Sequence, residues 1–304
     1  MNVLNLFVRT YSFLQRYPGM PFWVLTPLRR MVRWGANKIL PTYLSKSNRT
    51  AKRGSCDVIV SLTSFPARIN SVWQVVECMQ RQSYKPAKII LWLSKEQFPS
   101  AESIPQSLKE RVDDVFEIRL VDGDIRSHKK YYYVLKEFPN NFIFLIDDDI
   151  YYPTDIIENS WKAHLLYPDR VICNYGLKIG YDSNGNLMPY KKWTRVYHFI
   201  TEDVFFGSGG GTLLSSSMLY KDVTDINLAQ RLTPIADDIW LNAMVNLAGY
   251  QKTLLSNGLL LPINIDGNIR LSSQNRGKEQ NDTQLESVIS YYKDKLNINP
   301  FSQK

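Results

Sequence analysis

The sequence is poor in the residues that bind soft metals and form disulfides. Its 304 residues include three cysteines and three histidines, namely Cys56, Cys78, Cys173, His128, His164 and His198. No two of them have the spacing of zinc ligands or of a redox pair, and an odd number of widely separated cysteines argues against a disulfide framework. A reducing, cytoplasmic environment is the simpler interpretation.

Acidic residues are absent from the first 56 positions. This segment holds ten Lys and Arg residues, so the rest of the chain is nearly neutral at −2, although the whole chain carries +8. Its apolar runs are well short of the roughly 18 residues of a membrane-spanning helix. Arg9 and Arg16 interrupt the apolar stretch near the start, and no small-residue cleavage site follows, which argues against a signal peptide.

Residues 1–54 are therefore expected to form a basic, helical extension, rich in aromatic residues such as Trp23 and Trp34. One interpretation places it in the interface of an anionic membrane, where each Lys or Arg contributes about 1 kcal/mol. The other packs it on the domain with its arginines in solvent. The first is favoured and predicts a peripheral location on the inner face of the cell membrane. Nucleic-acid binding is not expected, because the basic segment is not joined to any recognisable nucleic-acid-binding motif.

From residue 57 onward, short apolar segments alternate with helical periodicity. Strands are predicted at 58–62, 88–93, 115–121 and 142–146, with helices between them at 72–79, 103–114 and 127–137. Strands that are apolar throughout are typical of a parallel sheet covered on both faces. The sequence therefore predicts an α/β fold with a mostly parallel central sheet flanked by helices.

The domain at 55–304 divides into three predicted parts. A nucleotide half covers about 55–150, an acceptor half about 151–282, and an amphipathic C-terminal helix about 283–296. In the acceptor half, 174–201 is a polar excursion, 234–248 is helical, and 252–255 and 259–265 are candidate strands.

Three consecutive aspartates, Asp147, Asp148 and Asp149, follow the apolar segment at 142–146. At the carboxyl end of a parallel strand they would face the crevice in which α/β sheets bind ligands. Two carboxylates about 5 Å apart repel by roughly 3 kcal/mol, so a cation, protonation or solvent exposure must offset the repulsion. Oxygen ligands select Mg²⁺ or Mn²⁺. An acidic turn that caps the next helix is the alternative.

The segment FLIDDDI resembles the Asp-x-Asp motif of GT-A glycosyltransferases, nearest to bacterial family-2-like enzymes of surface polysaccharide synthesis. The resemblance covers roughly residues 57–265. It implies a Rossmann-type sheet, a UDP- or GDP-linked sugar donor, and a saccharide or polyprenyl-linked acceptor. It also implies that Asp149 is the main metal ligand, that Asp147 beside it contacts the ribose or a metal-bound water, and that Asp148 is the intervening residue.

Two predicted loops carry candidate donor-binding residues. Thr63, Ser64 and Arg68 follow the first strand, where hydroxyls can donate hydrogen bonds and the guanidinium can pair with phosphate. A turn at a helix start with a surface arginine is the alternative. The loop after the third strand supplies further candidates, Asp124, Lys129 and Lys130.

In that second loop, Asp124 would meet the base or ribose, and the lysines would neutralise the diphosphate. Lys130 is the best single candidate, because the apolar helix begins just after it. A solvated charged turn is the alternative.

A glycine-rich segment, 205–212, permits close backbone approach. It lacks the phosphate-loop pattern, and the resemblance implies that Gly209 and Gly210 line the donor sugar and acceptor. A flexible turn is the alternative.

Asp237 and Asp238 open a predicted helix and resemble the Glu-Asp pair of family-2-like enzymes, although the first acid here is Asp. The resemblance implies that Asp238 is the catalytic base and that Asp237 orients a neighbour or the acceptor. Acids that complement a helix dipole are the alternative. That family often has a late histidine as a third metal ligand, but no histidine follows His198 here, so the third ligand is either absent or supplied by another residue such as Asp266 or Asn268.

The predicted function is a metal-dependent, inverting glycosyltransferase of cell-surface polysaccharide synthesis. Two alternatives remain: a metal-dependent nucleotidyl- or phosphotransferase, and a non-catalytic membrane-surface scaffold with a degenerate nucleotide site. The second acidic pair and the glycine-rich segment favour sugar transfer over both.

Overall fold

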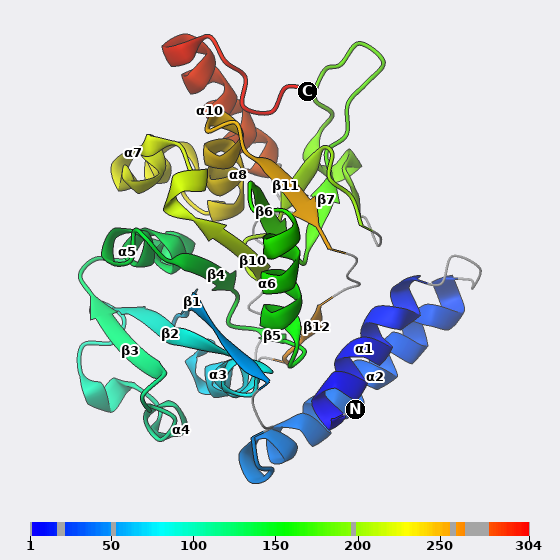
Figure 1. Ribbon diagram of the computed structural model, residues 1–304, viewed down its shortest axis with the longest axis vertical. Helices are drawn as coiled ribbons and strands as arrows, with labels where there is room; N and C mark the ends of the chain where they lie inside the picture. The colour runs from blue at the N-terminus through cyan, green and yellow to red at the C-terminus, as the bar shows by residue number, and fades with distance from the viewer. Residues whose placement is uncertain are drawn as a thin grey trace.

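A seven-stranded sheet in the order β11-β6-β10-β4-β1-β2-β3 forms the centre of the computed structural model, which describes residues 2–16, 22–49, 53–195, 199–255, 260–264 and 280–303 (Figure 1). Its strands are β1 Gly54–Thr63, β2 Tyr84–Ser94, β3 Phe116–Val121, β4 Phe142–Ile146, β6 Arg170–Cys173, β10 Gly210–Ser215 and β11 Gln251–Leu254. Neighbouring strands pair in parallel except β10, which is antiparallel to β4 and β6. The predicted mostly parallel sheet is therefore confirmed.

Both faces of this sheet are buried, which explains its continuously apolar strands. Val58 and Val60 of β1 join the cluster on one face that includes Val75 of α3. Ile59 between them joins the cluster on the other face with Val134 of α5, because successive side chains of a strand point to opposite faces. The covering helices are α3 Val72–Gln80, α5 Lys129–Glu137, α6 Ile156–Leu166, α7 Ile226–Leu232, α8 Asp237–Leu247 and α10 Gln280–Leu296.

Two small sheets complete the fold. One joins β12 Leu261–Pro262 to β5 Ile150–Tyr151, and the other has the order β8-β7-β9, with β7 Gly176–Lys178, β8 Thr194–Arg195 and β9 Val204–Phe206. The predicted strand at 259–265 is therefore two residues long within the described chain, and its ends at 259 and 265 lie outside the described residues. The polar excursion at 174–201 contributes β7 and β8.

The predicted helix at 103–114 is wrong. The α-helix α4 spans only Gln106–Lys109, after a 3₁₀ turn at Ala101–Ser103. Pro105 precedes α4, and an Oδ1 atom of Asp113 accepts hydrogen bonds from the amides of Val115 and Phe116 at 2.9 and 2.8 Å. Aspartate side chains that bond nearby amides compete with helical pairing, so the chain turns into β3 instead.

The basic N-terminal segment forms two helices, α1 Val3–Arg16 and α2 Phe22–Lys46, which pack side by side at the edge of the molecule (Figure 1). Leu4, Ala36 and Leu40 are buried and join the same apolar cluster as β1 and α3. None of the helices within the described residues is long and apolar enough to cross a membrane. The predicted helical extension therefore has a packed face, as the second interpretation required.

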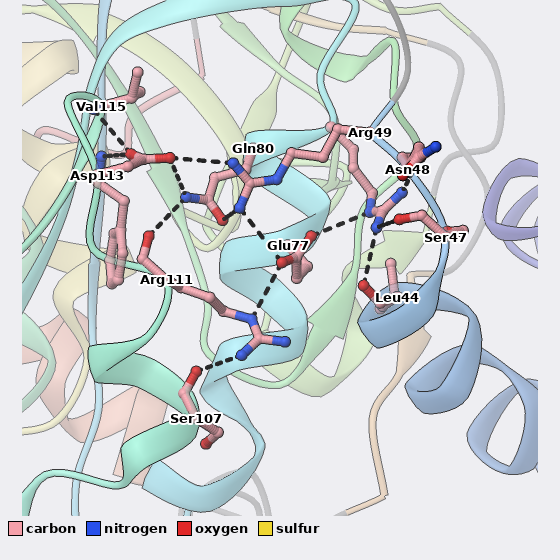
Figure 2. Close-up of polar contacts among 12 residues, drawn as sticks. Leu44, Ser47, Asn48, Arg49, Glu77, Gln80, Ser107, Arg111, Asp113 and Val115 are labelled. Atoms are coloured by element: carbon pink, nitrogen blue, oxygen red, sulfur yellow. Dashed lines mark hydrogen bonds and ion pairs between the residues drawn. The ribbon is translucent and has the colours of Figure 1, made fainter.

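A buried polar network fastens the end of α2 to α3 (Figure 2). The guanidinium of Arg81 donates to the carbonyl oxygens of Leu44, Ser47 and Asn48 at 2.8–2.9 Å, and its Nε pairs with Glu77 at 3.2 Å. Arg81 and Glu77 are 2% and 6% exposed. Cations satisfy the orphan carbonyls at a helix C-terminus, so Arg81 holds the end of α2 in place.

We predict that Arg81→Met lowers the free energy of unfolding by roughly 3 kcal/mol, because breaking a buried, hydrogen-bonded ion pair costs about 3–5 kcal/mol. Urea denaturation measures this change. Lys85→Met is the control, because Lys85 pairs with Asp114 at 2.9 Å while both side chains are exposed, and it should change stability by less than about 1 kcal/mol. Equal losses for both variants would contradict the role assigned to Arg81.

Candidate active site

The three aspartates follow β4, as predicted, and their side chains differ in exposure. The side chains of Asp147 and Asp149 are 41% and 28% exposed, whereas that of Asp148 is 6% exposed. The first and third carboxylates are therefore available to a ligand, and the second is enclosed by protein.

The loop after β1 supplies the partners of Asp148. Its two carboxylate oxygens accept hydrogen bonds from Arg68 Nη1 at 2.7 Å and Ser64 Oγ at 2.6 Å. The same Nη1 lies 3.0 Å from Oδ2 of Asp149. Because Arg68 is 7% exposed, its charge acts on these carboxylates from inside the protein. Arg68 and Ser64 thus contact the aspartate motif directly.

Lys130, at the start of α5, links the aspartate motif to the second acidic pair. Its Nζ lies 2.8 Å from Asp147 Oδ1 and 3.1 Å from Asp237 Oδ2. Ser208 completes the connection: its hydroxyl donates to Asp237 at 2.7 Å, and its amide donates to Asp238 Oδ1 at 2.7 Å. The predicted metal motif and the predicted catalytic pair therefore belong to one cluster.

The antiparallel register of β10 brings the glycine-rich segment to Asp147. Gly210 lies opposite Ile146, the last residue of β4, so Gly209, just before β10, lies beside Asp147, just after β4. A Cβ atom on Gly209 would be 1.8 Å from Cγ of Asp147. No side chain fits there unless Asp147 moves.

Burial and mutual repulsion shift the proton affinities of this cluster. Burial, followed by the charges of its two neighbours in the motif, raises the pKa of Asp149 to about 7. Burial and the adjacent Asp237 raise the pKa of Asp238 to about 7. Burial acts to raise the pKa of Asp237, but the charge of Lys130, the nearby His128 and the hydrogen bond from Ser208 together lower that pKa.

The raised pKa values of Asp149 and Asp238 make the folded protein less stable as the pH rises. The folded protein binds protons more tightly than the unfolded chain, whose aspartate pKa is about 4. Ionising Asp149 and Asp238 therefore costs stability as the pH rises from about 4 through 7. A bound cation would offset that cost by favouring the ionised carboxylates.

The remaining predicted residues lie in other contacts. The hydroxyl of Thr63 donates to the Trp92 carbonyl at 2.8 Å. Lys129 and Asp124 form an ion pair with each other, and Gly210 faces Tyr175, whose Cβ would lie 2.2 Å from an added Cβ. None of these contacts includes the aspartate motif, so the predicted roles of these residues toward a donor stay predictions.

Sequence reasoning missed three side chains that shape the site. Ser208 accepts a hydrogen bond from Lys130 at 3.1 Å and donates to both acids of α8. Asn242, one turn after Asp238, donates to its carbonyl at 2.9 Å and to that of Phe206 at 2.8 Å. The hydroxyl of Tyr152 accepts from the Asp147 amide at 2.8 Å. The glycine-rich context of Ser208 and the i, i+4 spacing of Asn242 were the available signals.

The donor set at Asp147 and Asp149 fits a hard divalent cation. Mg²⁺ is usually bound by one or two carboxylates together with substrate phosphates, and both side chains are partly exposed oxygen ligands. Within the described ranges, no group of three or more His, Cys, Asp or Glu residues is placed to hold a metal. The proposed third ligands, Asp266 and Asn268, lie outside the described residues.

The fold and the motif at the end of β4 define a GT-A-like glycosyltransferase, as the sequence predicted. A family model described as the glycosyl transferase family 64 domain matches residues 58–252. The chain therefore belongs to this glycosyltransferase family. No curated protein matches the chain.

Three solved structures are similar to this chain, and the one with a TM-score of 0.50 supports the same fold. S. aureus TarS 1-349, in a crystal structure with UDP-GlcNAc, is 9% identical, with a TM-score of 0.50 over 79% of this chain and 67% of that chain. The same protein with UDP gives 9% identity and a TM-score of 0.43 over 78% and 72%. HddC from Yersinia pseudotuberculosis gives 14% identity and a TM-score of 0.34 over 57% and 79%.

We predict that Gly209→Ala abolishes transferase activity while leaving the protein folded, because the new methyl group must displace the carboxylate of Asp147. Activity assays and circular dichroism measure the two effects. Gly180→Ala is the control, since an added Cβ there meets its nearest atoms at 3.4 Å, an ordinary contact. Normal activity of Gly209→Ala would show that the position of Asp147 is not needed.

Proposed function

We propose that this glycosyltransferase moves a sugar from a UDP- or GDP-linked donor to a saccharide or polyprenyl-linked acceptor, with inversion, in cell-surface polysaccharide biosynthesis. The observation that carries the proposal is the cluster that joins Asp147 to Asp238 through Lys130 and Ser208, with Asp149 held beside it by Arg68. Sugar transfer needs both a place for the diphosphate and a base for the acceptor, and this cluster offers carboxylates suited to each.

In the proposed reaction, Asp238 accepts the proton of the acceptor hydroxyl. The acceptor oxygen forms a bond to the anomeric carbon, the bond from that carbon to the diphosphate breaks, and its electron pair leaves with the nucleoside diphosphate. The Ser208 amide holds Oδ1 of Asp238 at 2.7 Å, which directs the other oxygen to the acceptor. A pKa of about 7 suits a general base at neutral pH.

We further propose that Asp147 and Asp149 hold Mg²⁺ or Mn²⁺. When bound, such an ion neutralises charge that develops on the departing diphosphate. Arg68 pairs with Asp149 at 3.0 Å and Lys130 pairs with Asp147 at 2.8 Å. The orientation of both carboxylates is therefore set before a ligand binds. Lys130 acts as a positioning residue, because it contacts Asp147 and Asp237 rather than solvent.

The basic N-terminal helices support a peripheral location on the inner face of the cell membrane, where polyprenyl-linked acceptors lie. Their charge is the supporting observation, since residues 1–56 contain no Asp or Glu. A nucleotidyl- or phosphotransferase would need the aspartate motif but would have no use for the acids of α8. A scaffold would need neither, so the two predictions below separate these functions.

We predict that Asp238→Asn reduces sugar transfer at least about 100-fold, because general-base catalysis typically contributes about 10²–10⁴-fold. Donor affinity should stay unchanged, because the substitution keeps the oxygen that accepts from Ser208. For the unsubstituted enzyme, kcat/KM should rise with pH through about 7 as Asp238 loses its proton. Transfer kinetics and donor titration measure both effects.

Asp225→Asn is the matched control for that substitution. Its carboxylate also accepts from a backbone amide, that of Leu228 at 3.0 Å, at the start of α7. Asn is an equally good residue at a helix N-terminus, so activity should not change. Unchanged turnover of Asp238→Asn would remove the proposed mechanism.

We predict that Mn²⁺ together with UDP or GDP raises the melting temperature, because a ligand at 100 times its Kd stabilises the folded state by about 2.7 kcal/mol. EDTA should reverse the shift, and Asp149→Asn should largely remove it. The control is Asp114→Asn, whose side chain is 76% exposed and pairs with Lys85. If neither nucleotide gives a metal-dependent shift, the non-catalytic scaffold is favoured instead.

A further inference from the structure

The outward face of α2 combines large apolar side chains with lysines. Trp23, Met31 and Trp34 are 75%, 67% and 65% exposed. On an α-helix these positions fall on one side together with the exposed residues Lys38 and Lys46. We call this face the outer stripe and define it by Trp23, Met31, Trp34, Lys38, Thr42 and Lys46.

The opposite side of the same helix is closed to any partner. Leu25, Ala36, Leu40 and Leu44 are between 0% and 8% exposed. The helix therefore has apolar side chains on two faces. One face packs against the protein core, and the other exposes Trp23, Met31 and Trp34 to solvent. Exposed apolar surface bordered by polar residues marks an interaction site.

Two features of the outer stripe identify its partner. No acidic residue occurs in the first 56 positions, so the surface complements a negatively charged partner. A shallow groove of about 540 Å³ lies at its end, lined by Lys38, Ile39, Thr42, Tyr43, Lys46 and Ser47. Ammonium and hydroxyl donors suit phosphate headgroups, and tryptophans suit the interface between headgroups and acyl chains.

We propose that the outer stripe docks on an anionic phospholipid bilayer, with its tryptophans in the interface and its lysines at the headgroups. The inference rests on the membrane location proposed above and assigns it to one face of one helix. The match is with helices that lie in the plane of a membrane, which present an apolar face beside basic residues.

This docking surface is tied to the aspartate motif by a short chain of hydrogen bonds. Asn37, within one turn of Trp34 and Lys38, donates to the Pro262 carbonyl at 3.1 Å and accepts from the Asn264 amide at 2.6 Å. Between them, the amide of Ile263 donates to the Asp149 carbonyl at 2.8 Å. One helix diameter of about 10–12 Å and one strand spacing of about 5 Å place Asp149 within roughly 20 Å of the membrane surface.

That distance has a consequence for the acceptor. An acceptor attached to a lipid phosphate also begins at the headgroup layer, so a docked enzyme would meet it without leaving the membrane. Because α2 is also fastened by Arg81, the docked helix would set the orientation of the whole site.

Vesicle co-sedimentation of the full-length protein tests the proposal. We expect binding to vesicles of phosphatidylglycerol and phosphatidylcholine and little binding to phosphatidylcholine alone. Lys38→Ala with Lys46→Ala should weaken binding about 25-fold, because each basic residue near an anionic leaflet contributes about 1 kcal/mol, which is about fivefold in affinity. Trp23→Ala with Trp34→Ala should also weaken it at least tenfold.

Leu166→Ala is the matched control, since Leu166 is 75% exposed on α6, as Trp23 is on α2, and its binding should equal that of the unsubstituted protein. Equal affinity for the two vesicle types, or undiminished binding by both double variants, would overturn the proposal. Asp238→Asn should still bind vesicles, and the stripe variants should still transfer sugar to a soluble acceptor. Failure of docking is thereby distinguished from failure of the proposed reaction.

Discussion

The ammonium of Lys130 lies between two acidic segments that are about 90 positions apart in sequence, and the arrangement of the site depends on it. Five aspartates converge here, and the cations that contact them, Lys130 and Arg68, carry two charges. Burial, followed by the charge of neighbouring aspartates, raises the pKa of Asp149 and Asp238 to about 7. Unbalanced negative charge in a buried cluster is costly to a protein that binds nothing there, and it becomes useful where a cation and a diphosphate bind together.

The sequence was sufficient to predict strands β1 to β4, β11 and the positions of both acidic segments, because an apolar strand before Asp147 and a helix that begins at Asp237 are local signals. It did not predict β6 or β10. The sequence did not predict which contacts bring the two acidic segments together. The antiparallel pairing of β10 joins segments about 60 residues apart, and no periodicity reports it. The role of Ser208 depends on that pairing, as does the need for Gly209. The wrong prediction of a helix at 103–114 has a local cause instead. There the side chain of Asp113 accepts hydrogen bonds from nearby amides, although the spacing of apolar residues favours a helix.

The N-terminal helices resolve a choice that the sequence left open. Packing on the domain and contact with a membrane were alternatives while the segment was considered as a string of residues. In the folded protein, α2 buries Leu40 and Leu44 against the domain and exposes Trp23 and Trp34, so the exposed face is available for the proposed contact with a membrane. A helix with apolar side chains on its exposed face as well as on its buried face can contact two partners, and the domain is the first.

This division of faces makes the helices part of the enzyme rather than an attached anchor. Removing residues 1–54 would take Leu4, Ala36 and Leu40 out of the apolar cluster that includes β1 and α3, and would leave Arg81 without the carbonyls to which it donates. A flexible anchor would raise the local concentration of enzyme at a membrane and leave its orientation open. A clamped helix that also contacts the segment bonded to Asp149 fixes orientation as well. If α2 docks as proposed, the membrane defines the direction from which an acceptor reaches the aspartates.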